Sequence, residues 1–129
     1  MHRFLVSLLV ASSALLTGGC QGHQPQRPSL ISHVVLIRLH DPVDVSAALS
    51  DCNALLADIE SIETFACGSP METGRAMVSD DFDIGLVIGF ASSEAYDAYL
   101  QDPVHLQLLE KWKPRTANMR IFDIVDPTP

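Results

Sequence analysis

Basic residues are scarce in this sequence, and their scarcity argues against a nucleic-acid partner. Eight Lys and Arg stand against sixteen Asp and Glu, which gives a formal net charge of −8. Binding to a phosphate backbone needs clustered Lys and Arg, and only the short segment KWKPR (111–115) offers a small cluster. The acidic excess favours solubility and indicates no particular partner.

An apolar run long enough to cross a bilayer is also missing. FLVSLLVASSALL follows the basic start MHR, but it is shorter than the roughly 20 residues that a spanning helix needs, so it is typical of a signal-peptide core. The segment LTGGC then resembles a bacterial lipoprotein box, with Thr17 where Leu is usual. We therefore expect residues 1–19 to be a signal peptide and Cys20 to be lipidated, which would anchor the protein on the extracytoplasmic side of a bacterial membrane. The alternative is an ordinary secretory signal with an incidental cysteine.

Residues 20–30 comprise this cysteine and a polar, Pro-rich segment that is typical of an extended tether. The remainder, 31–126, has the length of one domain. Its two cysteines, Cys52 and Cys67, lie 15 positions apart. In an exported protein such a pair indicates a disulfide, which would contribute about 3 kcal/mol by closing this loop. Two free thiols in the core are the alternative, because the sequence does not give the Cα separation that a bridge requires.

Runs of β-branched residues predict four strands, at 31–39, 62–68, 82–90 and 118–125. The first run, ISHVVLIRL, is continuous, which is typical of a strand covered on both faces. Its alternation places Ile31, His33, Val35 and Ile37 on one face, and Val34 and Leu36 on the other.

Apolar residues at helical spacing predict a helix over 44–60, with Asp44 as N-cap. A second helix begins after Ser92, and Asp102 with Pro103 starts a third. The order β-α-β-β-α-α-β predicts an α+β fold, the ferredoxin-like split βαβ sheet with helices on one face. Because Val34, Leu36, Phe122 and Ile124 make the other face apolar too, we expect a homodimer in which two sheets pack into a barrel.

Four segments together resemble a known family: SHVVLIRL, FDIGLVIGF, YDAYLQDPVHLQLL and RIFDIV. They are similar to the stress-responsive dimeric α/β barrel (Dabb) family over 31–126. Most members of this family have no assigned activity, but one plant member closes a linear polyketide by aldol chemistry in a pocket between sheet and helices. The resemblance implies a catalytic pair, Tyr99 and His105, and it matches His33 and Asp123 to two further residues of that pocket. Cys52 replaces a pocket tyrosine, so the substrate would differ.

The residues themselves support a site at His105. This residue shares a helix face with Leu108, Leu109 and Trp112, so its ring should point inward. The positive end of the helix dipole should lower its pKa and leave a neutral base, while Tyr99 could polarise a carbonyl. Three roles stay open: catalysis by His105 and Tyr99, as in a polyketide cyclase or lyase, binding of a small apolar ligand, and packing.

Binding of a ligand, or a structural role in a stress response, is favoured over catalysis. The expected pocket residues share positions facing the helix–sheet interface: His33, Val35, Ile37, Leu49, Cys52, Leu108, Ile121 and Asp123. No cofactor or metal is expected, because SDDFD (79–83) lacks the Gly and Glu of a calcium loop and turn chemistry explains His40, Asp41 and Asp44.

Overall fold

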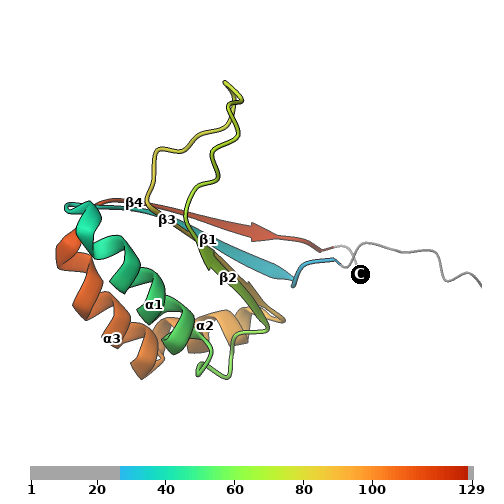
Figure 1. The fold of residues 1–129 in the computed structure, drawn as a ribbon. Helices are drawn as coiled ribbons and strands as arrows, with labels where there is room; N and C mark the ends of the chain where they lie inside the picture. The colour runs from blue at the N-terminus through green and yellow to red at the C-terminus, as the bar shows by residue number, and fades with distance from the viewer. Residues whose placement is uncertain (1–26, 128–129) are drawn as a thin grey trace, which may run out of the picture.

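A computed structural model describes residues 27–127 of the chain (Figure 1). Its strands form one antiparallel sheet in the order β2-β3-β1-β4, and its helices cover one face, so the predicted ferredoxin-like fold is confirmed. The elements, in chain order, are β1 (Ile31–Leu39), η1 (Pro42–Asp44), α1 (Val45–Leu56), β2 (Thr64–Gly68), β3 (Ile84–Phe90), α2 (Ser93–Gln101), α3 (Pro103–Trp112), η2 (Lys113–Arg115) and β4 (Thr116–Val125).

The central strand β1 shows why the helices lie on one face only. Its side chains alternate strictly, and every second one from Ile31 to Leu39 is buried beneath the helices. Val34 and Leu36 point to the other face and are half-buried. A single chain therefore covers one face of β1, and the cover predicted for the other face would come from the second copy of the expected homodimer.

Local capping chemistry sets the starts of α2 and α3 as predicted. The backbone N–H of Ala95 donates to Ser92 Oγ at 3.1 Å, and that of Val104 donates to Asp102 Oδ1 at 2.8 Å. Asp102 itself has an extended backbone (ψ 130°), so it ends α2 and turns the chain into α3. Because of this break, His105 in the first turn of α3 faces the cavity between the sheet and the helices.

The start of α1 differs from the prediction. Asp44 makes no side-chain cap bond and instead accepts a 2.9 Å hydrogen bond from Arg115 Nη1. Asp41 is the capping residue, accepting from the Val43 N–H at 3.0 Å at the start of η1. The helix then begins at Val45 and ends at Leu56, four residues before the predicted end.

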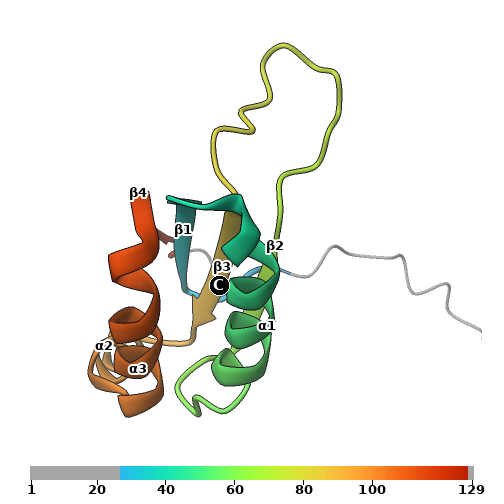
Figure 2. The same cartoon turned by 60° about the vertical axis from the view of Figure 1, so that its left-hand side comes forward.

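Residues 69–83, between β2 and β3, form a long arm that rises from the sheet on the side away from the helices (Figures 1 and 2). Met71 and Met77 are among its exposed residues, at 77% and 97%. At the end of the arm, the Phe82 ring lies over Gly85 of β3. At the other end of β3, the hydroxyls of Ser29 and Thr64 lie over Gly89. Side chains of this chain therefore occupy the space beside both glycines, where a side chain would otherwise stand.

The two ends of the described chain are tied together beside the sheet. Arg27 Nη2 donates to both carboxylate oxygens of Asp126, at 2.8 and 2.6 Å, and the Asp126 N–H donates to the Leu30 carbonyl. The predicted signal peptide, the lipidated Cys20 and most of the tether lie outside the described residues. Within 27–127, no helix is long and apolar enough to cross a membrane.

Candidate functional site

A cavity of about 90 Å³ lies between the sheet and the helices. Side chains of β1, β3 and β4 form its floor, and α1, α3 and Tyr99 of α2 form its roof. Its wall is almost wholly apolar and mostly aliphatic, with Val35 and Ile37 on the floor and Ala48 and Leu108 on the roof. Such a lining favours an apolar ligand.

Polar side chains gather at one end of this cavity. The ring of Tyr99 stacks on that of His105, with centroids 4.1 Å apart, and meets the ring of His33 edge-on at 5.8 Å. Three separate elements, β1, α2 and α3, bring these rings together. His33, Tyr99 and His105 therefore offer hydrogen-bonding groups to whatever occupies that end of the cavity.

His105 has an unsatisfied ring nitrogen. Its Nδ1 is buried and has no hydrogen-bond partner among the described residues. Burial lowers the pKa of His105 below its usual value, and nearby His33 lowers it further, against the opposing effects of the Leu100 and Tyr99 carbonyls and of Asp102. The expected direction is confirmed, although burial is the main cause rather than the helix dipole. A neutral ring is thus the favoured form near pH 7.

Tyr99 keeps its proton. Burial raises the pKa of its hydroxyl well above the usual value, and the neighbouring Cys52 and Tyr96 raise it further. The side chain is only 3% exposed. Tyr99 is therefore a neutral hydrogen-bond donor at the polar end of the cavity.

His33 is held by a carboxylate on the neighbouring strand. Asp123 accepts a 2.6 Å hydrogen bond from His33 Nδ1 through Oδ1, and a 3.1 Å bond from the Tyr96 hydroxyl through Oδ2. The His33 side chain is 7% exposed and that of Asp123 is 46% exposed. Asp123 therefore supports His33 from the edge of the sheet.

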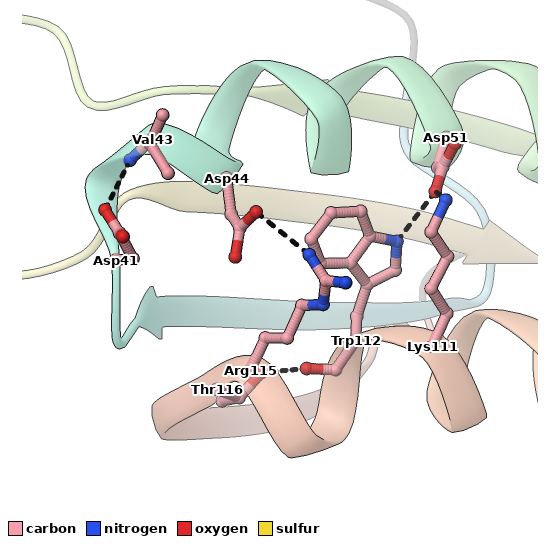
Figure 3. A network of polar contacts seen from close by, with 8 residues as sticks. All are labelled: Asp41, Val43, Asp44, Asp51, Lys111, Trp112, Arg115 and Thr116. Carbon is pink, nitrogen blue, oxygen red and sulfur yellow. Dashed lines mark hydrogen bonds and ion pairs between the residues drawn. The ribbon is translucent and has the colours of Figure 1, made fainter.

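Beside the other end of the cavity, a polar network joins α1 and α3 and holds Trp112 in place (Figure 3). The indole N–H of Trp112 donates to Asp51 Oδ2 at 2.9 Å, and Lys111 Nζ lies 2.6 Å from the same oxygen. The Lys111 hydrogen bond lowers the pKa of Asp51. Arg115, which pairs with Asp44, lies with Lys111 against the Trp112 ring. This network fixes Trp112 as part of the cavity wall.

The sequence left a bridge and two free thiols open for Cys52 and Cys67, and in this structure both are free thiols. The two thiols are nevertheless neighbours, because the Cys52 thiol donates a hydrogen bond to the Cys67 sulfur. This bond and burial both raise the pKa of Cys52. The same bond lowers the pKa of Cys67, and burial opposes that shift. Cys52 also lines the cavity.

Six of the eight expected pocket residues line the cavity: His33, Val35, Ile37, Cys52, Leu108 and Ile121. Leu49 does not; it packs against the core beside the cavity. Asp123 is also outside the lining and reaches the site only through His33. The sequence prediction missed a group at the far end, Leu39, Trp112, Lys113 and Met119. Trp112 was detectable from its helix face, shared with His105.

Within residues 27–127, no group of three or more His, Cys, Asp or Glu side chains is arranged to hold a metal ion. Local bonds account for the acidic segments: Asp81 pairs with Arg38 at 2.7 Å, and Asp83 accepts from the Leu39 N–H at 2.8 Å.

The fold and cavity define a ferredoxin-like α+β protein whose pocket lies between sheet and helices. The family model of the stress responsive A/B barrel domain matches residues 31–126, and the chain belongs to this family. No curated protein matches it significantly.

Many solved structures share the fold, among them the following three. A dimeric ferredoxin-like protein of unknown function from Thermobifida fusca is 20% identical, with a TM-score of 0.64, and covers 78% of this chain and 100% of its own. A Dabb family protein from Mesorhizobium loti is 22% identical, with a TM-score of 0.63 and coverages of 76% and 97%. A hydroxynitrile lyase from Passiflora edulis is 14% identical, with a TM-score of 0.66 and coverages of 80% and 99%.

Proposed function

We propose that this chain is a binding protein for a small, largely apolar molecule that carries one polar group. The observation that carries the proposal is the composition of the cavity: an aliphatic wall that ends on His33, Tyr99 and His105. A carbonyl at that end would accept a hydrogen bond from the Tyr99 hydroxyl, and a hydroxyl there would donate one to the buried, unpaired Nδ1 of His105. A purely structural protein needs neither the open space nor the unpaired nitrogen.

Binding of 2-octanone tests this proposal, because the ketone joins an aliphatic chain to one carbonyl. Trp112 is the only tryptophan of the chain and lines the cavity, so its fluorescence reports occupancy. The ketone should change the emission saturably and raise the melting temperature. Ala48→Leu should abolish both effects, because Ala48 lines the cavity and is 2% exposed, so the larger side chain would fill the space.

The control for Ala48→Leu is a small-to-large change elsewhere on α1, Ala47→Leu, at an exposed position. This variant should bind 2-octanone as the unchanged protein does. Absence of any saturable response in the unchanged protein, or equal binding by folded Ala48→Leu, would refute the binding role.

A second candidate is proton-transfer catalysis, favoured by one observation: His105 is a half-buried base with a lowered pKa, and it stacks on a protonated tyrosine. His105 Nδ1 would take a proton from a carbon next to a carbonyl, while the Tyr99 hydroxyl donates to the developing oxyanion. Turnover of a β-ketoacyl compound should then fall about a hundredfold or more in His105→Ala, with ligand binding kept. No turnover with such a compound would leave binding as the role.

We also propose that two copies of the chain pair through the outer face of the sheet. Val87, Phe122 and Ile124 are 48–55% exposed there, and such a patch favours a partner surface. The arm with Met71 and Met77 rises on the same side, where it would flank a second sheet. The Thermobifida fusca protein of the same fold is described as dimeric, which supports this arrangement.

We propose export and a lipid anchor at Cys20, because a basic start, a short apolar run and the segment LTGGC precede the tether. The tether would then join the domain beside the Arg27–Asp126 pair.

A further inference from the structure

Lys113 stands apart from the other two cations of its segment. Lys111 pairs with Asp51 at 2.6 Å and Arg115 pairs with Asp44 at 2.9 Å. Across residues 27–127, no ion pair joins Lys113 to a carboxylate, yet Lys113 lines the cavity. A cation without a partner on the rim of an aliphatic cavity is available to a ligand.

The position of Lys113 sets the shape of that ligand. His105 lies in the first turn of α3, and Lys113 follows directly after its last residue. Eight residues of helix rise about 12 Å, so the two ends of the cavity are separated by roughly this length. Among the residues that line the cavity, Lys113 and Ile121 are exposed to solvent. They place the mouth of the cavity between the end of α3 and the edge strand β4.

We infer that the ligand is an amphiphilic carboxylate: its apolar body lies in the cavity, and its anionic end pairs with Lys113 at the mouth. This inference rests on the proposed binding role and adds the charge and the orientation of the ligand. The carboxylate stays near water, where Lys113 compensates its charge, so neither ion has to be buried. The polar end at His33, Tyr99 and His105 then receives the distal carbonyl or hydroxyl.

The test compares three molecules with one skeleton: 2-octanone, 7-oxooctanoate and 7-oxooctanamide. The acid replaces the terminal methyl group of the ketone with a carboxylate, and the amide is its neutral counterpart. Trp112 fluorescence gives the affinity of each. Lys113→Gln should weaken binding of 7-oxooctanoate about two- to fivefold, the range expected for an exposed ion pair, and leave the two neutral molecules unchanged.

Two control variants separate local from general charge effects. Lys113→Arg keeps the charge and should keep the preference for the acid. Arg75→Gln removes a positive charge from the exposed arm and should leave all three affinities unchanged. Added salt should weaken binding of the acid alone in the unchanged protein.

The outcomes distinguish the two proposals. If 2-octanone binds and Lys113→Gln leaves the affinity for 7-oxooctanoate unchanged, the anionic ligand is refuted while the binding role stands. If the acid binds no better than the amide to the unchanged protein, the anionic ligand is refuted as well. If none of the three molecules binds, both proposals fall.

Discussion

His33 Nδ1 donates a 2.6 Å hydrogen bond to Oδ1 of Asp123, the residue directly opposite it in the β1–β4 pair. An ionised carboxylate only accepts hydrogen bonds, so the hydrogen of the neutral imidazole is placed on Nδ1. Nε2 then carries the lone pair, and His33 is an acceptor in the cavity wall.

Asp123→Asn should release this tautomer, because a carboxamide can also donate to Nδ1. Nitrogen NMR shifts of the ring should show the hydrogen of neutral His33 on Nδ1 in the unchanged protein, and on both nitrogens in exchange in the variant. Tyr96→Phe is the control, since it removes the bond to Oδ2 and keeps the one to Oδ1. A ring protonated only on Nε2 in the unchanged protein would contradict the assignment.

The lowered pKa of His105 makes the fold sensitive to mild acid. The unfolded chain binds this proton near the ordinary pKa of 6.5, and the folded chain binds it only at lower pH. Between the folded-state pKa and about pH 6.5, unfolding therefore takes up a proton. The free energy of unfolding falls as the pH drops through this range. His105→Gln should reduce the fall in melting temperature between about pH 7.5 and about pH 5.5. His40→Gln, at an exposed position, should leave this fall in melting temperature unchanged. An equal dependence of melting temperature on pH in the unchanged protein and both variants would contradict this prediction.

Cys52 and Cys67 should differ in reactivity, because the thiolate is the reactive form. Cys67 has the lowered pKa and the greater exposure, so iodoacetamide should label it before Cys52 in the folded, reduced protein. In a separate, unlabelled sample, a small disulfide oxidant should join the two neighbouring thiols by exchange and be released as its two thiols. Mass spectrometry reports both results, and faster labelling of Cys52 would contradict the assignment.

Phe122→Glu should dissociate the proposed dimer, because an unpaired charge within an apolar interface costs several kcal/mol. Leu106→Glu is the matched control: Leu106 is 47% exposed on α3, and Phe122 is 50% exposed on the outer face. Sedimentation at micromolar concentration should give a dimer for the unchanged protein and for Leu106→Glu. A monomeric unchanged protein would refute the pairing of the sheets.

Cys20→Ser should release the protein from the membrane fraction and abolish incorporation of labelled fatty acid in a bacterial host. Cys67→Ser, within the domain, is the control and should change neither. Secretion of the unchanged protein without a fatty-acid label would favour the ordinary secretory signal.

Features with local causes were predictable from the sequence. The alternation of β1 and the caps at Ser92 and Asp102 depend on neighbouring residues, and the structure contains all three. Asp44 was misjudged because its partner, Arg115, is distant in the sequence and competes with the cap.

The composition of the site depended on contacts between distant elements. The stacking of Tyr99 on His105 requires the break at Asp102 and the seating of α2 and α3 on the sheet, so the residues alone left their roles open. Leu49 was misplaced because a helix pattern gives a broad apolar face and not the few side chains that border a cavity. Lys113 was missed because its position at the mouth depends on how the end of α3 meets β4.

The edge strand β4 makes the charge of Asp123 important in a second way. Ile121, Phe122, Ile124 and Val125 are all at least half exposed, and they surround Asp123 on an edge with free backbone groups. A short β-prone segment of this kind nucleates edge-to-edge aggregation unless a charge interrupts it. Asp123 supplies a charge at this point, so we expect its neutralisation to lower colloidal stability whenever the proposed partner sheet is absent.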